Sequence, residues 1–199
     1  MEELSTAEKP AAIRVAAICG SLRSGSFNRG LIRCAIDLCY KAISGMLIEF
    51  VDVSELPLLN TDLEIDGSYP PSVEAFRLKI LGADSILFAS PEYNYSLSAP
   101  LKNAIDWGSR PPNVWAGKTA AVVSVAGGSA GRRSQYHLRQ VGVFVDLQFI
   151  NKPEVFILGH KPPKKFDSDG NLIDPETKQQ LKELLLSLQL FTLRLQRSL

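Results

Sequence analysis

The chain reads Ile13-Arg-Val-Ala-Ala-Ile-Cys19 and continues as Gly20-Ser-Leu-Arg-Ser-Gly-Ser-Phe-Asn28, after which a helical pattern begins. A buried strand followed by a loop of small residues and then by the start of a helix is typical of a phosphate-binding site. The reason is that loop amides and the helix N-terminus direct positive partial charge at one point. Further donors in the loop are the side chains of Ser21, Arg23, Ser26 and Asn28.

Two familiar phosphate loops do not match this stretch. A Walker A loop needs a lysine directly after its second glycine, and Ser26 occupies that position after Gly25. A dinucleotide fingerprint needs three glycines, and only Gly20 and Gly25 lie here. A loop rich in hydroxyls with one arginine suits a single phosphomonoester. The alternative is an ordinary Ser/Gly connection capped by Asn28.

Length and composition narrow the class of protein. A length of 199 residues predicts a single domain, over residues 11–199. Residues 1–10 are polar and carry both signs of charge, so we expect a flexible N-terminal tail there. The apolar fraction of 45% is ordinary for a soluble globular protein, and the net charge of +1 gives no sign of a polyanionic partner. The sequence contains no basic stripe with interleaved aromatic residues, so nucleic-acid binding is not predicted. It also contains no apolar run long enough to predict a transmembrane segment.

Three cysteines, Cys19, Cys34 and Cys39, show no metal-ligand spacing and are odd in number. They predict free thiols in a reducing, cytoplasmic compartment. Asp167-Ser-Asp-Gly-Asn171 lacks the spaced ligands and terminal glutamate of an EF-hand and is interpreted as a tight turn. The sequence therefore predicts no metal site.

Apolar runs alternate with helical patterns along the whole chain. Such alternation, with continuously apolar strands, predicts an α/β fold: an open five-stranded parallel sheet with helices on both faces. The expected strands are Ile13–Cys19, Met46–Val53, Asp84–Ser90, Lys118–Ala126 and Val155–Leu158. The expected helices run from about Asn28 to Ser44, over Val73–Leu81, Pro100–Trp107 and Arg133–Val145, and from Pro175 onward.

Ligands bind at the carboxyl ends of the strands in such sheets, which selects two further loops. Pro91-Glu-Tyr-Asn-Tyr-Ser96 offers aromatic walls and in-plane hydrogen-bonding groups for a flat heteroaromatic ring. Glu92 is as well explained by a carboxylate that bonds neighbouring loop amides. Ala126-Gly-Gly-Ser-Ala-Gly131 would let a flat ligand approach the backbone, or is a flexible turn. A phosphate at one end and a planar ring at the other describe flavin mononucleotide.

Three motifs together resemble the NADPH-dependent FMN reductase family, and within it the NAD(P)H:quinone oxidoreductases of flavodoxin-like fold. They are Gly20-Ser-Leu-Arg-x-x-Ser-x-Asn28, Pro91-Glu-Tyr-Asn-x-Ser96 and Leu101-Lys-Asn-Ala-Ile-Asp-Trp107. The similarity covers about Ile13 to Leu158. One departure is Tyr95, where many members carry glycine.

The resemblance implies a cofactor site for FMN. The phosphate of FMN would be held by Ser21, Arg23, Ser26 and Asn28, with Phe27 beside them. The ring system of FMN would be lined by Pro91, Glu92, Tyr93 and Asn94. The other edge of the ring would face Ser124, Gly127 and Gly128. Arg132 and Arg133 are either attractants for the NADPH phosphate or solvated arginines.

The activity implied is FMN-dependent NAD(P)H:quinone oxidoreduction, a two-electron, ping-pong hydride transfer with NADPH or NADH as co-substrate. The cofactor carries this chemistry, so no catalytic acid–base side chain is nominated. The alternatives are an NAD(P)H-dependent flavin reductase and a flavodoxin-like electron carrier. Carriers of that kind are usually strongly acidic, whereas this chain is near neutral.

The last helix predicts self-association. One apolar stripe at helical spacing is enough to cover the sheet and consists of Leu181, Leu184, Leu188, Phe191 and Leu195. A second set, Leu186, Leu190 and Leu193, lies on roughly the opposite face. Trp107 and Trp115 are further candidates for apolar surface. An exposed apolar patch indicates a partner subunit, so we expect a homodimer or homotetramer.

Overall fold

A parallel sheet carries the fold in the computed structural model, which describes residues 12–197. The tail expected over residues 1–10 lies outside the described residues. The strands are β1 (Ile13–Cys19), β2 (Met46–Val51), β3 (Ser85–Ala89), β4 (Thr119–Ala126), β5 (Gln148–Phe149) and β6 (Val155–Leu158). Their order is β2-β1-β3-β4, with β5 and β6 both paired to β4. The predicted α/β class and the parallel sheet are confirmed.

The fifth position of the sheet is divided between two short strands. β5 pairs with the start of β4 at Thr119 and Ala120, and β6 pairs with its end from Val123 to Ala126. The connection between them contains Pro153, which cannot donate to a ladder. The sequence predicted one strand here because the two residues of β5 are too few to give a periodic pattern.

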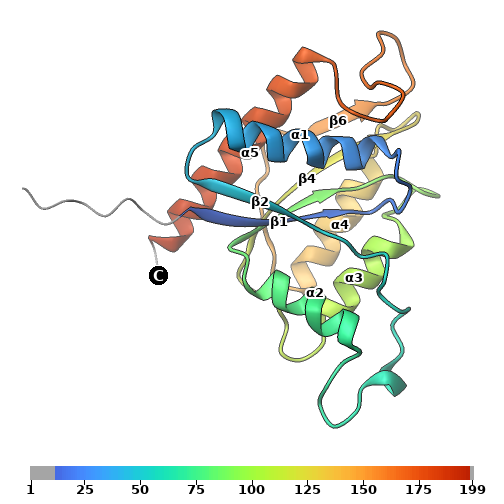
Figure 1. Cartoon of the computed structure of the whole chain (residues 1–199), viewed down its shortest axis with the longest axis vertical. Coiled ribbons are helices and arrows are strands. Elements are labelled where there is room, and N and C mark those ends of the chain that lie inside the picture. Colours follow the sequence, from blue (N-terminus) through green and yellow to red (C-terminus); the bar gives the residue numbers. More distant parts are fainter. Residues whose placement is uncertain (1–11, 198–199) are drawn as a thin grey trace, which may run out of the picture.

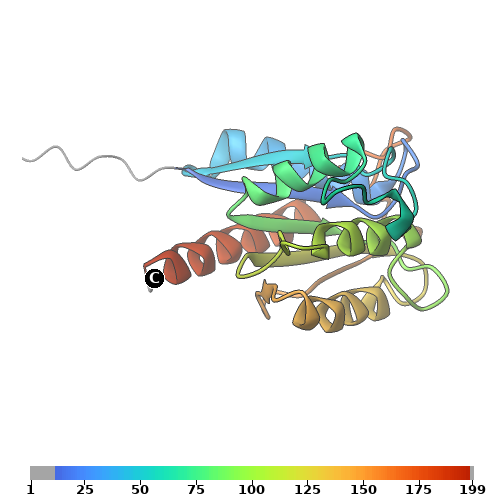
Figure 2. The same cartoon turned by 90° about the horizontal axis from the view of Figure 1, so that it is seen from below.

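Five α-helices cover the two faces of the sheet (Figures 1 and 2). The helices are α1 (Phe27–Ala42), α2 (Pro71–Leu81), α3 (Ala99–Ser109), α4 (Arg132–Phe144) and α5 (Pro175–Gln196). α1 and α5 pack on one face, and α2, α3 and α4 on the other. A 3-10 helix, Thr61–Leu63, lies in the excursion after β2. No helix within residues 12–197 combines the length and apolarity needed to cross a bilayer.

The alternation of side chains along the strands produces the two faces. In β1, Val15 and Ala17 pack under α1 and α5, whereas Ala16 and Ile18 pack on the side of α2 and α3. Every residue of β3 is buried. Continuous burial of this kind explains why the strands read as unbroken apolar runs.

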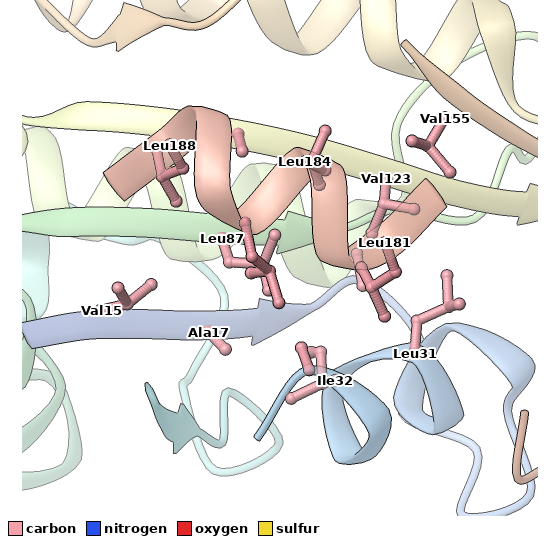
Figure 3. Close-up of a cluster of buried hydrophobic side chains, with 14 of the residues drawn as sticks. Val15, Ala17, Leu31, Ile32, Leu87, Val123, Val155, Leu181, Leu184 and Leu188 are labelled. Carbon is pink, nitrogen blue, oxygen red and sulfur yellow. The ribbon is translucent and has the colours of Figure 1, made fainter. Parts of the chain in front are cut away.

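Helix α5 closes one of the two cores. Leu181, Leu184 and Leu188 of α5 lie over the sheet, as Figure 3 shows, and all three are fully buried. These three positions of the predicted core stripe are confirmed; Phe191 packs partly buried against the same core, and Leu195 is not part of it. Leu193, expected on the outer face, instead packs partly buried against the core.

The two tryptophans do not form surface patches, and that expectation was wrong. Trp107 and Trp115 are both fully buried. The indole of Trp107 donates to the carbonyl of Pro57 at 2.7 Å, and that of Trp115 donates to the carbonyl of Ile105 at 2.9 Å. Buried indoles satisfy their N–H in this way. The tryptophans therefore stabilise α3 and the excursion after β2.

Candidate functional site

Three loops meet at the carboxyl edge of the sheet, on the right-hand side of Figure 1. The loop after β1 packs directly on the loop after β3, because a Cβ on Gly20 would lie 2.9 Å from Pro91 Cδ and 2.8 Å from Ser98 Oγ. The Ser98 hydroxyl donates to the carbonyl of Gly20 at 2.5 Å. Glycine is therefore required where these two loops touch.

A first cavity, of about 190 Å³, opens between these loops and the end of β4. It contains most of the residues that the sequence predicted for the cofactor site. Its lining consists of Ser21, Arg23, Ser26, Phe27, Asn28, Pro91, Glu92, Tyr93, Val125, Ala126, Gly127 and His160. The sheet thus brings together residues that lie far apart in the sequence.

The start of α1 is a free anion-binding end. Ser26 is the N-cap residue, but its side chain makes no capping hydrogen bond, and the first turn of α1 contains no acidic residue. In the described part of the chain, no hydrogen bond or ion pair engages the exposed guanidinium of Arg23. Uncapped helix amides and a free guanidinium together favour a phosphate.

Asn28 has a structural role in addition to lining the cavity. Its amide nitrogen donates to the carbonyl of Val125 at 2.9 Å, and its Oδ1 accepts the amide of Val125 at 3.0 Å. The carboxamide therefore ties the start of α1 to β4. Only its second N–H is left to reach a ligand.

The loop after β3 is a tight two-residue hairpin. The amide of Tyr93 donates to the carbonyl of Ser96, and the amide of Ser96 donates back, at 3.1 and 3.0 Å. Asn94 and Tyr95 have φ values of +49° and +68°. Such left-handed conformations cost a residue with a side chain about 1 kcal/mol, which accounts for the glycine expected at position 95.

A second cavity, of about 540 Å³, continues from the first towards this hairpin. Glu92, Ala126 and Gly127 line both cavities. The remaining lining is Asn94, Tyr95, Gly128, Ser129 and Arg133. The two cavities form one hollow of the size that ligand sites have.

Glu92 joins the second loop to the start of α4. Its Oε2 accepts the amide of Arg133, and its Oε1 accepts the Arg133 guanidinium, both at 3.1 Å. Burial raises the pKa of Glu92, but hydrogen bonds from Ser129, Arg133 and the amide of Ser134 outweigh it and hold the pKa below its usual range. Of the two alternatives that the sequence left open for Glu92, the hydrogen bond from a nearby amide is present, and this amide belongs to the first turn of α4.

The change Glu92→Gln is expected to lower the free energy of unfolding by about 1–2 kcal/mol at neutral pH, because it removes charge-assisted hydrogen bonds. A carboxylate with a depressed pKa stabilises the fold above its unfolded pKa, about 4.3 for glutamate, and loses that contribution as the pH falls through the folded pKa. Urea unfolding should therefore show a difference between the proteins that shrinks below about pH 4. A difference that stays constant into the acid range would contradict this role.

Arg133 is held by a second contact. Its guanidinium lies 3.9 Å from the ring centroid of Tyr95, and the guanidinium of Arg132 lies 4.3 Å from that of Phe156. Both are cation–π contacts. Neither arginine is therefore a freely solvated side chain.

The loop after β4 exposes the backbone of two glycines and rests on the buried side chain of Ser124. A Cβ on Gly127 or Gly128 would meet nothing within 4 Å, so this backbone faces open space. Ser124 is fully buried; it donates to the carbonyl of Ala130 at 2.7 Å and accepts from Gln135 at 2.8 Å. The structure therefore places Ser124 under the loop and not in either cavity.

Comparison with known proteins agrees with this geometry. Residues 13–161 match the model of the family described as NADPH-dependent FMN reductase. The chain belongs to that family. A probable NADPH:quinone oxidoreductase 2 from Oryza sativa subsp. japonica is 68% identical over 187 residues, 94% of this chain and 92% of the relative. An NADPH:quinone oxidoreductase from Arabidopsis thaliana is 66% identical over 98% of both chains.

A solved structure extends the comparison. FerB, a flavoenzyme NAD(P)H:(acceptor) oxidoreductase from Paracoccus denitrificans, superposes with a TM-score of 0.77 at 30% identity, covering 94% of this chain and 98% of FerB. A flavodoxin from the domain Archaea superposes with a TM-score of 0.55 at 13% identity, covering 89% of this chain and 99% of the flavodoxin, so the flavodoxin-like fold inferred from the sequence is confirmed.

One residue that lines the first cavity was not predicted from the sequence. His160 follows β6 and reaches the first cavity, where its ring centroid lies 5.7 Å from that of Phe27. The rule that selected the other loops applies to this one, because His160 also lies at the carboxyl end of a strand.

Proposed function

We propose that this chain is an FMN-dependent NAD(P)H:quinone oxidoreductase with FMN lying across the first and second cavities. The observation that carries the proposal is one hollow with an anion-binding end at α1 and an open glycine backbone at Gly127. A phosphomonoester fits the first end, and a flat ring fits the second. The relatives from rice and Arabidopsis are both NADPH:quinone oxidoreductases by name.

The residues present match the chemical groups of FMN. Arg23, Ser21 and the amides that begin α1 would hold the phosphate. Pro91, Glu92, Tyr93, Asn94, Gly127 and Gly128 would surround the ring system. Ser124 would act through the loop that it supports and not by contact. Asn28 would fix the distance between the two ends by its bonds to Val125.

Bound FMN would supply the redox chemistry, accepting a hydride from NAD(P)H and passing two electrons to a quinone. The protein's own task is to orient flat molecules. Tyr93 and Tyr95 are both more than half exposed; Tyr93 lines the first cavity and Tyr95 lines the second. The hydrogen bonds that Arg133 donates to Glu92 fix the wall of the second cavity. A single open face serves both the nicotinamide and the quinone, so the two substrates bind in turn, in a ping-pong cycle.

Steady-state kinetics with flavin retention test this function. The purified protein should show flavin absorbance that persists through gel filtration. Double-reciprocal plots at several quinone concentrations should give parallel lines, as ping-pong kinetics require. Loss of flavin on the column would favour the flavin reductase alternative. Negligible NAD(P)H oxidation by a flavin-loaded protein would favour the electron carrier.

We further propose that the enzyme is a homodimer or homotetramer that uses the outer face of α5. Leu186 and Leu190 on this face are 37% and 69% exposed. Apolar side chains of this size on a helix surface are typical of a subunit contact.

The double change Leu186→Glu and Leu190→Glu is expected to yield monomers, because two carboxylates would lose their hydration in the contact. Light scattering after gel filtration measures the mass. Leu78→Glu, at an exposed leucine of α2, is the matched control and should keep the wild-type mass. An unchanged mass for the double variant would show that α5 is not the interface.

A cytoplasmic location accords with the three cysteines. Cys19, Cys34 and Cys39 are all free thiols, and burial raises the pKa of each, that of Cys39 to about 11. Protonated, protected thiols are suited to a reducing compartment.

A further inference from the structure

A third cavity, of about 610 Å³, lies beside the phosphate loop and adjoins the proposed FMN site. It opens between the start of α1 and the loop that connects β6 to α5, drawn in orange at the top right of Figure 1. It shares Arg23, Phe27 and His160 with the first cavity and no residue with the second. It therefore adjoins the phosphate end of the hollow and not the ring end.

One wall of this cavity is aromatic. Phe27 stacks on Phe166 with ring centroids 4.4 Å apart and planes 9° apart, and His160 lies tilted beside Phe27. Phe166 is almost fully buried, so the stack is fixed in place. A rigid aromatic wall with an exposed imidazole suits a flat base such as adenine.

The rim of the same cavity is cationic. Arg23, Lys161 and Lys164 line it, and no side-chain hydrogen bond or ion pair within residues 12–197 engages any of the three. Because Arg23 is already assigned to the FMN phosphate, Lys161 and Lys164 are the cations left for a second ligand. Other cations nearby are paired: Lys165 lies 3.3 Å from Asp174, and Arg29 lies 3.4 Å from Asp52. Unpaired cations that converge on a cavity favour an anionic ligand.

The one acidic residue of the lining is already committed to the backbone. Asp167 accepts the amides of Asn171 and Asp169 at 2.8 and 3.0 Å, and hydrogen bonds from Asn171 hold its pKa below the usual range. The carboxylate closes the turn predicted from the sequence. The negative charge of Asp167 offsets part of the positive potential of Lys164, and the net charge of the residues that line the cavity stays positive.

The arginines that the sequence suggested for the NADPH phosphate are engaged elsewhere. Arg133 is paired with Glu92 and stacked on Tyr95, and Arg132 lies over Phe156. Recruiting Arg133 would compete with its pairing to Glu92, and Arg132 would have to bind from its place over Phe156. Lys161 and Lys164 have no such contacts within residues 12–197.

We propose that the third cavity binds the adenosine 2′-phosphate of NADPH, with Lys161 and Lys164 as the residues that distinguish NADPH from NADH. This inference rests on the proposed function, because it places the nicotinamide end at the second cavity. The adenine would lie against His160 and the 2′-phosphate between the two lysines. NADH lacks the dianion that these cations would bind, so it gains nothing from them.

The double variant Lys161→Ala and Lys164→Ala tests the assignment in the FMN-loaded protein. The KM for NADPH should rise about tenfold or more, as the loss of charge-assisted phosphate contacts predicts, and the KM for NADH should change less than twofold. Lys41→Ala, a surface lysine in the last turn of α1, is the matched control and should change neither value. Equal rises for the two nucleotides would overturn the proposal.

A binding measurement separates this inference from the activity. Calorimetry with 2′-AMP, against adenosine as the ligand without phosphate, should show phosphate-dependent binding that weakens about tenfold or more in the double variant. Equal binding of 2′-AMP to both proteins would overturn the subsite even if NADPH is oxidised. Weakened 2′-AMP binding in a protein that oxidises neither nucleotide would keep the subsite and refute the oxidoreductase. Loss of FMN from the double variant would assign the lysines to the FMN phosphate and overturn the proposal.

Discussion

Replacing Gly30 by alanine is expected to lower the free energy of unfolding by about 2–4 kcal/mol. Gly30 lies in the first turn of α1, and a Cβ there would collide with the carbonyl oxygen of Gly170. Gly170 cannot move aside easily, because it has φ +78° and itself packs against the carbonyl of Gly25. In the solvent-exposed interior of a helix, a change from glycine to alanine would raise the free energy of unfolding by about 1 kcal/mol. The contact with the 166–171 loop reverses the sign.

Denaturant unfolding of the flavin-free protein measures this effect without a contribution from ligand binding. Gly127→Ala is the matched control, since its Cβ would meet nothing within 4 Å, and it should leave the free energy of unfolding within about 0.5 kcal/mol of wild type. If Gly30→Ala proved as stable as wild type, the loop after β6 would not rest on α1 as the structure places it. The third cavity would then lose one of its walls.

Arg23→Ala is expected to raise the dissociation constant for FMN by about 10- to 100-fold, because a charge-assisted contact to phosphate contributes about 1.5–3 kcal/mol. The side chain is exposed and unpaired in the described chain, so its removal should not alter the free energy of unfolding. Quenching of FMN fluorescence on titration with flavin-free protein measures the affinity.

Arg14→Ala is the control for this change, because Arg14 lies on β1 at the opposite edge of the sheet. It removes the same charge and should leave the affinity for FMN within about twofold of wild type. If the two variants bound FMN equally well, the phosphate would lie outside the first cavity. A weak Arg23→Ala variant that also unfolds easily would show that Arg23 supports the fold.

Local pattern was enough to predict the sheet and the places where its loops meet. The apolar run Ile13–Cys19 is β1 as predicted, because strands buried on both faces need continuous apolar sequence. The loop Gly20–Asn28 and the glycines after β4 lie at the carboxyl edge for the same topological reason. Glu92 accepts a backbone amide, as one of the two alternatives for it required, although the amide lies in the first turn of α4.

The roles of individual side chains depended on partners that the sequence does not reveal. Asn28 bonds Val125, which lies 97 positions away, and Ser124 is covered by the loop that follows its own strand. Trp107 and Trp115 became core residues because the excursion after β2 and the end of α3 supply carbonyls for their indoles. Contacts of this kind follow from the folded topology and not from spacing along the chain.

The central claim is that this member of the NADPH-dependent FMN reductase family transfers electrons from NAD(P)H to a quinone through FMN that stays bound. The most direct test is anaerobic oxidation of NADPH by the FMN-loaded protein, with and without benzoquinone, followed by filtration to recover free flavin. We expect rapid oxidation only with the quinone, one NADPH consumed per quinone reduced, and flavin retained with the protein. Oxidation that is independent of the quinone, with reduced FMN in the filtrate, would contradict the claim.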